Sequence, residues 1–478
     1  MRTIAIERFI SKPLKNFLFI IIGNGIRWIL SFFVTVYLAR VLGASGFGKL
    51  SLAFSIFAYG VLLSDLGLTI YGTREVARNK EGVDEITSKI VSLRLLLSVF
   101  AFFLLLLFAL FVPLENVTRV LLLLYSFSLF FYAFYLDWFY RGRERMSNIA
   151  VASIITQAVY VGLVFIIVKG ADSIMKIPLL WFIAIGSGTA FILILFFINK
   201  HRLKFHIDFS LLKLSIPVGI AVIMNQVYFH FDLITIGLIK GALDVGLYNA
   251  AFKIVTFLLF IDTAFAWVYL PMVSRFFLDS KEKLKTLVFT SMKFISLIVI
   301  PLAFGGTLLG ERIMLFIYGA KYIGAIAPFR ILVWAIPLTS IQTVFAFGLL
   351  GCNREKKYSY GMVIGTLLNI VFNLILIPHF GINGAATATL ISEVVMFVAM
   401  FLWFKEIFFI PFYRYLLKPL LATVIMVVVM LLLWKVHTFY IIVIAVFVYS
   451  LAIWSLRGIT GEDIKLLRGG YGAIHRNN

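Results

Sequence analysis

Apolar residues form long runs along most of the chain, and short polar segments interrupt them at fairly regular intervals. A membrane-spanning helix needs roughly 20 mostly apolar residues. Fourteen runs approach or exceed that length, near residues 16–39, 48–72, 88–112, 119–140, 148–168, 177–198, 211–239, 246–272, 286–309, 327–350, 360–378, 384–404, 415–435 and 438–456. The pattern therefore predicts an all-α membrane protein of fourteen transmembrane helices. The first run lacks a cleavage site of small residues, so we expect it to be retained.

The composition agrees with this prediction. Hydrophobic residues make up 62% of the chain and charged residues 14%, and the mean hydropathy of +1.04 excludes an ordinary soluble protein. A single cysteine, Cys352, rules out an internal disulfide and a thiolate metal cluster. No polar connection is long enough to form a separate soluble domain.

The net charge of +21 follows the predicted topology rather than a nucleic-acid surface. Of the 43 Lys and Arg residues, 29 fall in the segments on the N-terminal side of the membrane and 9 in the loops on the other side. Cytoplasmic segments of membrane proteins carry such an excess of Lys and Arg. We therefore expect both termini to be cytoplasmic, with attraction to anionic lipids as a by-product.

An internal repeat relates the two halves of the chain. Leu38 and Gly46 recur as Leu238 and Gly246 at an offset of 200, and later matches such as Arg119 with Arg330 fit an offset of 211. A repeat of six spans has two copies of the same orientation, as in transporters built of two parallel halves. We expect two six-helix lobes related by a pseudo-two-fold axis along the membrane normal. The predicted parts are a cytoplasmic N-terminal segment 1–15, an N-lobe 16–199, a cytoplasmic linker 200–210, a C-lobe 211–404, two extra helices in 405–456 and a cytoplasmic tail 457–478.

Polar side chains occur at membrane depth, where they are costly and usually face a cavity or a partner. The stretch "NQVYFHFDL", residues 225–233, places its polar residues on one side of a helix, and the first span does the same. These faces predict a cavity between the lobes, lined mainly by the first two helices of each half. The candidate cavity residues are Arg27, Lys253, Asn24, Ser31, Asn225, Gln226, Tyr228, His230, Asp232 and Asn369. The candidates for binding a coupling ion are Asp65, Asp232, Asp262 and Glu393.

Structural roles compete with these assignments. Arginines and lysines close to span ends reach the membrane interface by snorkelling, which applies to Arg94, Arg119, Lys293 and Arg330. His230 fits a helix–helix hydrogen bond as well as it fits a proton relay. Arg27 and Lys253 favour a cavity role, with a structural ion pair to Asp65 or Asp262 as the alternative. The 50 phenylalanines are more typical of lipid-facing or core positions than of sugar stacking.

Several longer stretches resemble a known family. "VYLARVLGASGFGKLSLAFSI" and "DLGLTIYGTREVAR" in the first two spans are similar to the opening of the polysaccharide flippases. These are O-antigen-type lipid-linked oligosaccharide transporters of the multidrug/oligosaccharidyl-lipid/polysaccharide exporter superfamily. "ERIMLFIYGAKYIGAIAPFRILVWA" and "NIVFNLILIPHFGINGAATATLISEV" extend the resemblance over nearly the whole chain.

The resemblance implies a V-shaped pair of lobes that alternates between inward-open and outward-open states. Its expected cargo is an isoprenoid phosphate- or pyrophosphate-linked oligosaccharide, carried across the cell membrane for surface polysaccharide or glycan assembly. Basic residues lining the cavity of such flippases face the anionic head of the substrate, and Arg27 and Lys253 suit that role here. The expected partners are this substrate, membrane lipids and polysaccharide assembly enzymes, but no nucleic acid.

Other functions stay open at this point. A cation-coupled multidrug antiporter of the same superfamily would want an acidic cavity, which Asp65, Asp232, Asp262 and Glu393 could form. A membrane glycosyltransferase or ligase would need catalytic residues in a large external loop, and a purely structural bundle would leave the buried charges unexplained. We expect no catalytic residues, because the outer loops hold no paired carboxylates and no clustered histidines. We expect no direct use of ATP, because the chain has no phosphate-binding glycine loop, and no cofactor apart from coupling to H⁺ or Na⁺.

Overall fold

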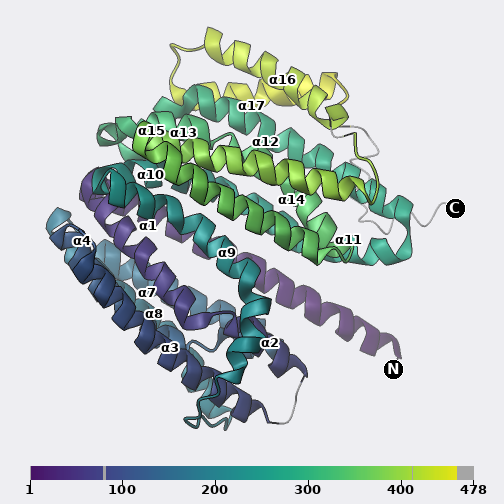
Figure 1. Cartoon of the computed structure of the whole chain (residues 1–478). Helices are drawn as coiled ribbons and strands as arrows, with labels where there is room; N and C mark the ends of the chain where they lie inside the picture. Colours follow the sequence, from purple (N-terminus) through teal and green to yellow (C-terminus); the bar gives the residue numbers. More distant parts are fainter. Residues whose placement is uncertain (1, 79–81, 412, 460–478) are drawn as a thin grey trace. The chain divides into compact units, whose positions relative to one another are not determined.

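The computed structural model is built of helices throughout the residues that it describes, 2–78, 82–411 and 413–459, and the side chains of 2–24, 26, 218 and 221 fall outside that description. Within this part, twelve helical stretches are long and apolar enough to cross a membrane. The chain is therefore a multi-pass membrane protein, as its apolar runs predict. The contacts divide it into two compact units, which are described separately (Figure 1).

The first unit comprises residues 1–253, 318–322 and 366–385. Its helices are α1 (Arg2–Asp65), α2 (Leu68–Arg78), α3 (Val83–Phe111), α4 (Asn116–Ser126), α5 (Leu129–Phe134), α6 (Asp137–Gly142), α7 (Met146–Ile167), the 3-10 helix η1 (Ala171–Lys176), α8 (Ile177–Ile198), α9 (Ser210–Ile239) and most of α10 (Ala242–Leu258).

The second unit comprises residues 254–317, 323–365 and 386–478. Its helices are α11 (Phe260–Asp279), α12 (Lys281–Tyr318), α13 (Ile326–Leu332), α14 (Ala335–Gly351), α16 (Tyr413–Leu432) and α17 (Thr438–Ser455), while η2 (Ala320–Ala325) and α15 (Glu355–Lys405) contribute to both units. This division by contacts differs from the lobes expected from the repeat, which stay a prediction.

Two of the twelve stretches are unusually long, at 52 and 51 residues, and each holds two of the expected spans. Helix α1 breaks at Gly43, with φ 69° and ψ 175°, between the first and second expected spans. Helix α15 breaks at Gly381, with φ 56°, between the eleventh and twelfth. Glycine adopts positive φ without a Cβ penalty, so both breaks fall where the sequence permits them. The twelve stretches thus accommodate the fourteen expected spans.

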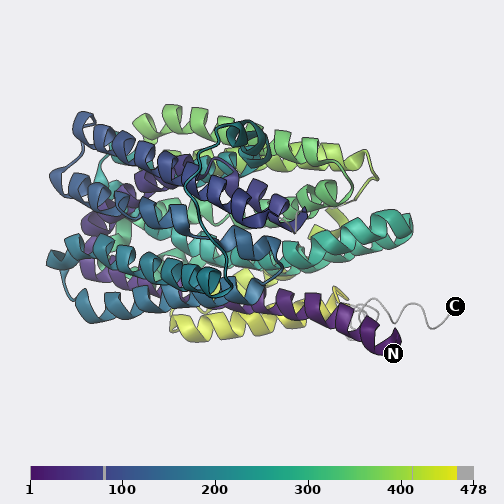
Figure 2. The same cartoon turned by 90° about the horizontal axis from the view of Figure 1, so that it is seen from below.

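The core of the first unit is a layered bundle around α1. Helices α3, α4 and α7 pack on α1, and α8 packs on α7. Figure 2 shows the blue helices α3, α4, α7 and α8 beside the purple α1, with their long axes roughly aligned. In the second unit, α16 and α17 form a hairpin, drawn in yellow in Figure 1. The hairpin packs on α12 through buried apolar side chains, and the Tyr449 hydroxyl donates a hydrogen bond to the Leu297 carbonyl of α12.

The structure corrects the register of the repeat near its start. Gly43 and Gly241, 198 positions apart, both turn the chain with positive φ, and both are followed by alanine. At this offset Gly48 matches Gly246, so the offset of 200 that pairs Gly46 with Gly246 is wrong by two residues. Backbone conformation distinguishes the two registers, whereas matches between apolar runs do not.

The prediction that Arg94 snorkels to the interface is also wrong. Arg94 is only 5% exposed, and its guanidinium lies 3.5 Å from the Asp65 carboxylate. The guanidinium also donates a hydrogen bond to the Tyr135 carbonyl. Arg119 has a structural role of a different kind, because it donates to the carbonyl of Ala109 at the end of α3. Arg94 is thus paired inside the bundle, whereas Arg119 stays at the span end where the sequence placed it.

Candidate functional site

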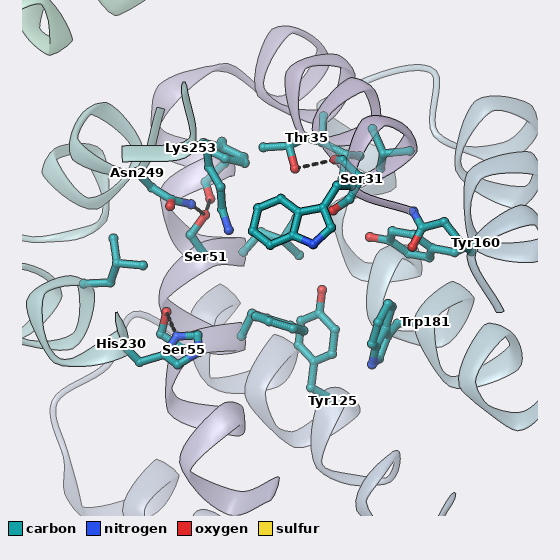
Figure 3. Close-up of a pocket in the computed structure, with 18 of the residues that line it drawn as sticks. Ser31, Thr35, Ser51, Ser55, Tyr125, Tyr160, Trp181, His230, Asn249 and Lys253 are labelled. Carbon is teal, nitrogen blue, oxygen red and sulfur yellow. Dashed lines mark hydrogen bonds between the residues drawn. The ribbon is translucent and has the colours of Figure 1, made fainter. Parts of the chain in front are cut away.

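A pocket of about 390 Å³ lies within the first unit and brings together side chains from α1, α4, α7, α8, α9 and α10 (Figure 3). Four of the residues expected to line a cavity line this pocket: Arg27, Ser31, His230 and Lys253. The first two come from α1 and the others from α9 and α10, roughly 200 residues later in the chain. The fold therefore assembles them from distant segments.

Arg27 and Lys253 give the pocket a basic character. Both side chains are exposed within it. In Figure 3 the Lys253 side chain extends from its helix into the pocket. Among the described lining residues there is no Asp or Glu, so this pocket offers two fixed cations to an anionic ligand.

The side of the pocket near Lys253 is made of linked polar residues. The Asn249 amide donates to the Ser51 hydroxyl at 2.7 Å, and Ser51 in turn donates to the Phe47 carbonyl at 2.7 Å. His230 lies 3.4 Å from the Ser55 hydroxyl. Asn249 and Ser51 are equivalent in the corrected repeat register, and both are buried. These bonds hold α1, α9 and α10 together around the base of Lys253.

The opposite wall is aromatic. Tyr160 of α7 meets Trp181 of α8 edge to face at 5.2 Å, and Trp181 meets Phe54 of α1 at 5.9 Å. Phe54 packs in turn on Tyr125 of α4 at 5.5 Å. Figure 3 shows Tyr125, Tyr160 and Trp181 across the pocket from Lys253. Edge-to-face contacts of this kind are a preferred arrangement of aromatic rings, so the four rings form one continuous wall.

Asp232 lies in a separate buried cluster rather than in the pocket. Its carboxylate accepts hydrogen bonds from the Tyr248 hydroxyl at 2.6 Å and from the Asn373 amide at 2.5 Å. The Asn373 amide also donates to the Asn369 side chain at 3.0 Å. The cluster joins α9, α10 and the middle of α15, all within the first unit. Asp232 and Asn369 are therefore brought together, away from Arg27.

The remaining candidate carboxylates occupy different places. Asp65 accepts from the Thr69 hydroxyl and backbone and pairs with Arg94. Asp262 and Glu393 are both buried in the second unit and lie close enough to interact electrostatically. The four candidate carboxylates for ion binding thus occupy three separate environments.

Three candidates on α9 do not line the pocket. Gln226 is exposed, Asn225 is half-buried and Tyr228 is buried. The side chain of Asn24 lies outside the described residues. The roles of all these residues stay predictions.

Sequence reasoning missed other lining residues, namely Trp28, Tyr125, Gln157, Tyr160, Trp181 and Asn249. The corrected repeat register would have pointed to Asn249, because it is the counterpart of Ser51. The aromatic residues carry no such signal, since aromatic side chains are common throughout the chain.

A multi-pass helical bundle with a basic pocket is typical of membrane transport proteins. Comparison with known proteins identifies the family to which the chain belongs. The model of the family described as "Polysaccharide biosynthesis protein" matches residues 13–277. The chain belongs to this family, which covers more than half of its length, and the resemblance seen in the sequence is thereby confirmed. The MatE family model matches residues 217–375.

Individual relatives agree with this assignment. The chain is 22% identical over 396 residues to a putative O-antigen transporter of Shigella dysenteriae, covering 81% of this chain and 98% of the relative. It is 28% identical over 166 residues to a probable low-salt glycan biosynthesis flippase of Haloferax volcanii, covering 34% and 35% of the two chains.

Solved structures show the fold. A lipid II flippase in an inward-closed conformation superposes with a TM-score of 0.76 at 20% identity, over 92% of this chain and 98% of that chain. A multidrug resistance transporter of the MATE family, in an inward-facing conformation, gives a TM-score of 0.66 at 16% identity, over 81% and 95%. The predicted all-α architecture is therefore that of these membrane transporters.

Proposed function

We propose that the protein is a flippase that moves an isoprenoid phosphate- or pyrophosphate-linked oligosaccharide across the cell membrane by alternating access. The observation that carries this proposal is the meeting of Arg27 and Lys253 in one pocket with an aromatic wall. The phosphate groups of a lipid-linked sugar need charge compensation in a low-dielectric site. Arginine and lysine supply it through charge-assisted hydrogen bonds.

The names of the relatives support the same substrate class. An O-antigen transporter, a glycan flippase and a lipid II flippase all carry such names, so a lipid-linked glycan is the substrate we infer for this chain. We further infer that it performs no glycosyl transfer itself and that polysaccharide assembly enzymes supply and consume its substrate.

The distribution of Lys and Arg along the chain supports one orientation of the protein in the membrane. The excess of Lys and Arg in alternating segments supports a cell-membrane protein with both termini in the cytoplasm. Substrate loaded at the basic pocket would then pass from the cytoplasmic side to the outer side.

A multidrug antiporter is the second candidate, favoured by the MatE match over residues 217–375. An organic cation would require carboxylates in the binding pocket. The described lining residues supply two cations and no carboxylate, which favours an anionic substrate.

We propose in addition that transport is coupled to H⁺ or Na⁺ at Asp232. A carboxylate buried at membrane depth is a functional site by default, and the Asn373, Asn369 and Tyr248 side chains around it offer further oxygen atoms. Asp65 is less suited, because Arg94 already neutralises it. Asp262 and Glu393 are a second candidate pair in the other unit.

The test is a proteoliposome assay that follows translocation of a lipid-linked oligosaccharide. Arg27→Ala should slow translocation by roughly 10- to 100-fold, the loss of one charge-assisted hydrogen bond, and Arg27→Lys should retain part of the activity. The exposed Lys356 offers a matched control, because Lys356→Ala removes one positive charge far from the lining residues in sequence. This control should translocate at the wild-type rate.

Two results would reject the proposal. Wild-type rates for a folded Arg27→Ala protein would make the arginine structural. Absence of translocation by the folded wild type, together with saturable binding of organic cations, would assign the chain to the antiporters.

A further inference from the structure

A second pocket, of about 710 Å³, lies within the second unit between α12, the segment formed by α13 and α14, and α16. Its volume is within the range of about 300–1,000 Å³ that is typical of ligand sites. Leu431 and Trp434 line it and are exposed on its α16 wall. Because this wall belongs to a membrane-spanning segment, the pocket is open to the surrounding lipid.

The pocket is charged at one end and apolar at the other. Arg330 lies beside the loop that follows α12, and Trp334 lies about one turn further into the membrane span. On α16, Trp434 lies at the loop end and Val427 about two turns deeper. Trp334 meets Phe304 of α12 edge to face at 5.0 Å, so apolar rings form the deep end. This gradient matches an amphiphile with a charged head and a hydrocarbon chain.

Arg330 offers its guanidinium to the pocket, unlike its counterpart in the repeat. Arg119 donates to the carbonyl groups of Ala109 and Leu114, which lie at and after the end of α3. Helix α12 instead continues to Tyr318, so its carbonyl groups beside Arg330 are engaged within the helix. Arg330 is exposed, and within the part of the chain that the structure describes no group bonds to it or pairs with it. Its N–H donors are therefore available to a phosphate.

A second arginine adds charge at this end of the pocket. Arg312 of α12 stacks over the Trp434 ring at 4.4 Å and donates to the carbonyl groups of Trp434 and Val436, so it holds Trp434 against α12. Glu311, the neighbouring carboxylate, pairs with neither arginine among the described residues. Lys435 follows Trp434 and is exposed. Because cations outnumber the carboxylate here, a ligand with net negative charge is favoured.

We propose that this pocket binds an acidic phospholipid of the outer leaflet, with its phosphate at Arg330 and an acyl chain between α12 and α16. In the proposed orientation, the charged end of the pocket lies at the outer side of the membrane. A membrane lipid is the occupant because the pocket is open to lipid along α16, and the surplus of cations selects an acidic headgroup. The two pockets share no lining residue, so the inference does not depend on the cargo of the first.

The experiment measures quenching of tryptophan fluorescence by phospholipids brominated in the acyl chain. Brominated phosphatidylglycerol and brominated phosphatidylcholine with the same chains are added to the purified full chain in detergent micelles. Bromine quenches at short range, and Trp334 and Trp434 line the pocket. The wild type should reach half of its maximal quenching at about tenfold lower mole fraction of phosphatidylglycerol than of phosphatidylcholine. The double variant Trp334→Phe/Trp434→Phe should lose the part of the quenching that differs between the two lipids.

Arg330→Ala should lose most of this tenfold preference. Arg330→Lys should retain part of it, because it keeps the charge and loses the planar fork of donors. The matched control is Arg275→Ala, which removes an exposed arginine of α11 outside the lining residues and should bind both lipids as the wild type does. Phosphatidylglycerol should also raise the melting temperature of the wild type and of Arg275→Ala, but not of Arg330→Ala.

Three outcomes would overturn the inference. One is equal quenching of the wild type by the two lipids, and another is a preference that survives in Arg330→Ala or in the double tryptophan variant. The third is displacement of brominated phosphatidylglycerol by a polyprenyl phosphate at lower mole fraction, which would assign the pocket to a transported lipid. None of these results bears on Arg27, so the flippase proposal is tested separately. The comparison of the two lipids needs only the wild type, so the inference stays testable if Arg330→Ala does not fold.

Discussion

Gly48 of α1 and Gly246 of α10 lie at a reciprocal helix crossing. A Cβ on Gly48 would stand 1.7 Å from the Ala242 carbonyl oxygen, and a Cβ on Gly246 would stand 1.9 Å from the Ala44 carbonyl oxygen. In the corrected register Ala44 matches Ala242 and Gly48 matches Gly246, so each copy of the repeat makes the same contact with the other. Small residues permit such close approach of membrane helices.

Alanine at either glycine should therefore be strongly destabilising. The obstacle is backbone, which a rotamer change cannot relieve, and overpacking typically costs about 1–3 kcal/mol of folding free energy or more. We expect Gly48→Ala and Gly246→Ala to lower the melting temperature in detergent by similar amounts. Gly162→Ala on α7 is the control, because its Cβ meets open space, and it should be neutral or stabilising by up to about 1 kcal/mol. Equal melting temperatures for all three variants would mean that the crossing relaxes freely.

The Asp65–Arg94 ion pair should be structural. Arg94 is buried, and Asp65 is held by Thr69 as well, so removal of one partner leaves an uncompensated charge, which costs about 3–5 kcal/mol in fully buried pairs. We expect Asp65→Asn to lower thermal stability markedly and the double variant Asp65→Leu/Arg94→Met to recover part of the loss. Thermal unfolding in detergent measures both.

The control for this pair is Asp279→Asn. Asp279 and its partner Lys283 are both exposed, and exposed ion pairs contribute about 0–1 kcal/mol. Equal losses of stability for Asp65→Asn and Asp279→Asn, with no recovery in the double variant, would contradict a buried structural pair.

The segment before α9 should resist proteolysis because α3 holds it. Backbone N–H groups of Arg202, Lys204 and His206 donate to the side chains of Asp84, Ser88 and Ser92 respectively. Alternate residues of an extended segment rise by about 6.6 Å and every fourth residue of a helix by about 6 Å, so the two series of groups stay in register. Ser88→Ala with Ser92→Ala removes two acceptors.

Each hydrogen bond contributes about 0.5–1.5 kcal/mol. The double variant should therefore be cut by trypsin after Arg202 and Lys204 roughly 5- to 100-fold faster than the wild type, where cleavage follows local opening. Peptide mapping by mass spectrometry measures the rates. Thr87→Ala is the matched control, since its hydroxyl bonds only to the Val83 carbonyl of its own helix. Unchanged cleavage in the double variant would show that other contacts hold the segment.

Asp232 should determine ion coupling. Asp232→Asn keeps the size of the side chain and loses its charge, so we expect translocation in proteoliposomes to become independent of an imposed H⁺ or Na⁺ gradient. The exposed Asp172→Asn should respond to the gradient as the wild type does. A gradient response that survives in Asp232→Asn would move the coupling site to Asp262 and Glu393, and wild-type transport insensitive to both gradients would remove coupling altogether.

Local patterns in the sequence determined the class of the protein. Apolar runs of sufficient length must be helices in a bilayer, because every backbone polar group needs a partner there. The spans, the basic character of the first and eighth spans and the family resemblance all follow from such patterns. Arg27 and Lys253 could be identified from the sequence because a charged side chain within a membrane span costs free energy, whichever helices the span packs against.

Only the tertiary structure decided which polar residues share a site. His230 and Asp232 are two residues apart, about 200° around a helix, so they face different neighbours: one lines the pocket and the other joins Tyr248 and Asn373. Gln157 is one polar residue in an apolar helix until α1 and α8 pack against that helix and a pocket forms beside it. Helix periodicity is a property of neighbouring residues, whereas the pocket depends on packing between segments some 200 residues apart, which no local pattern specifies.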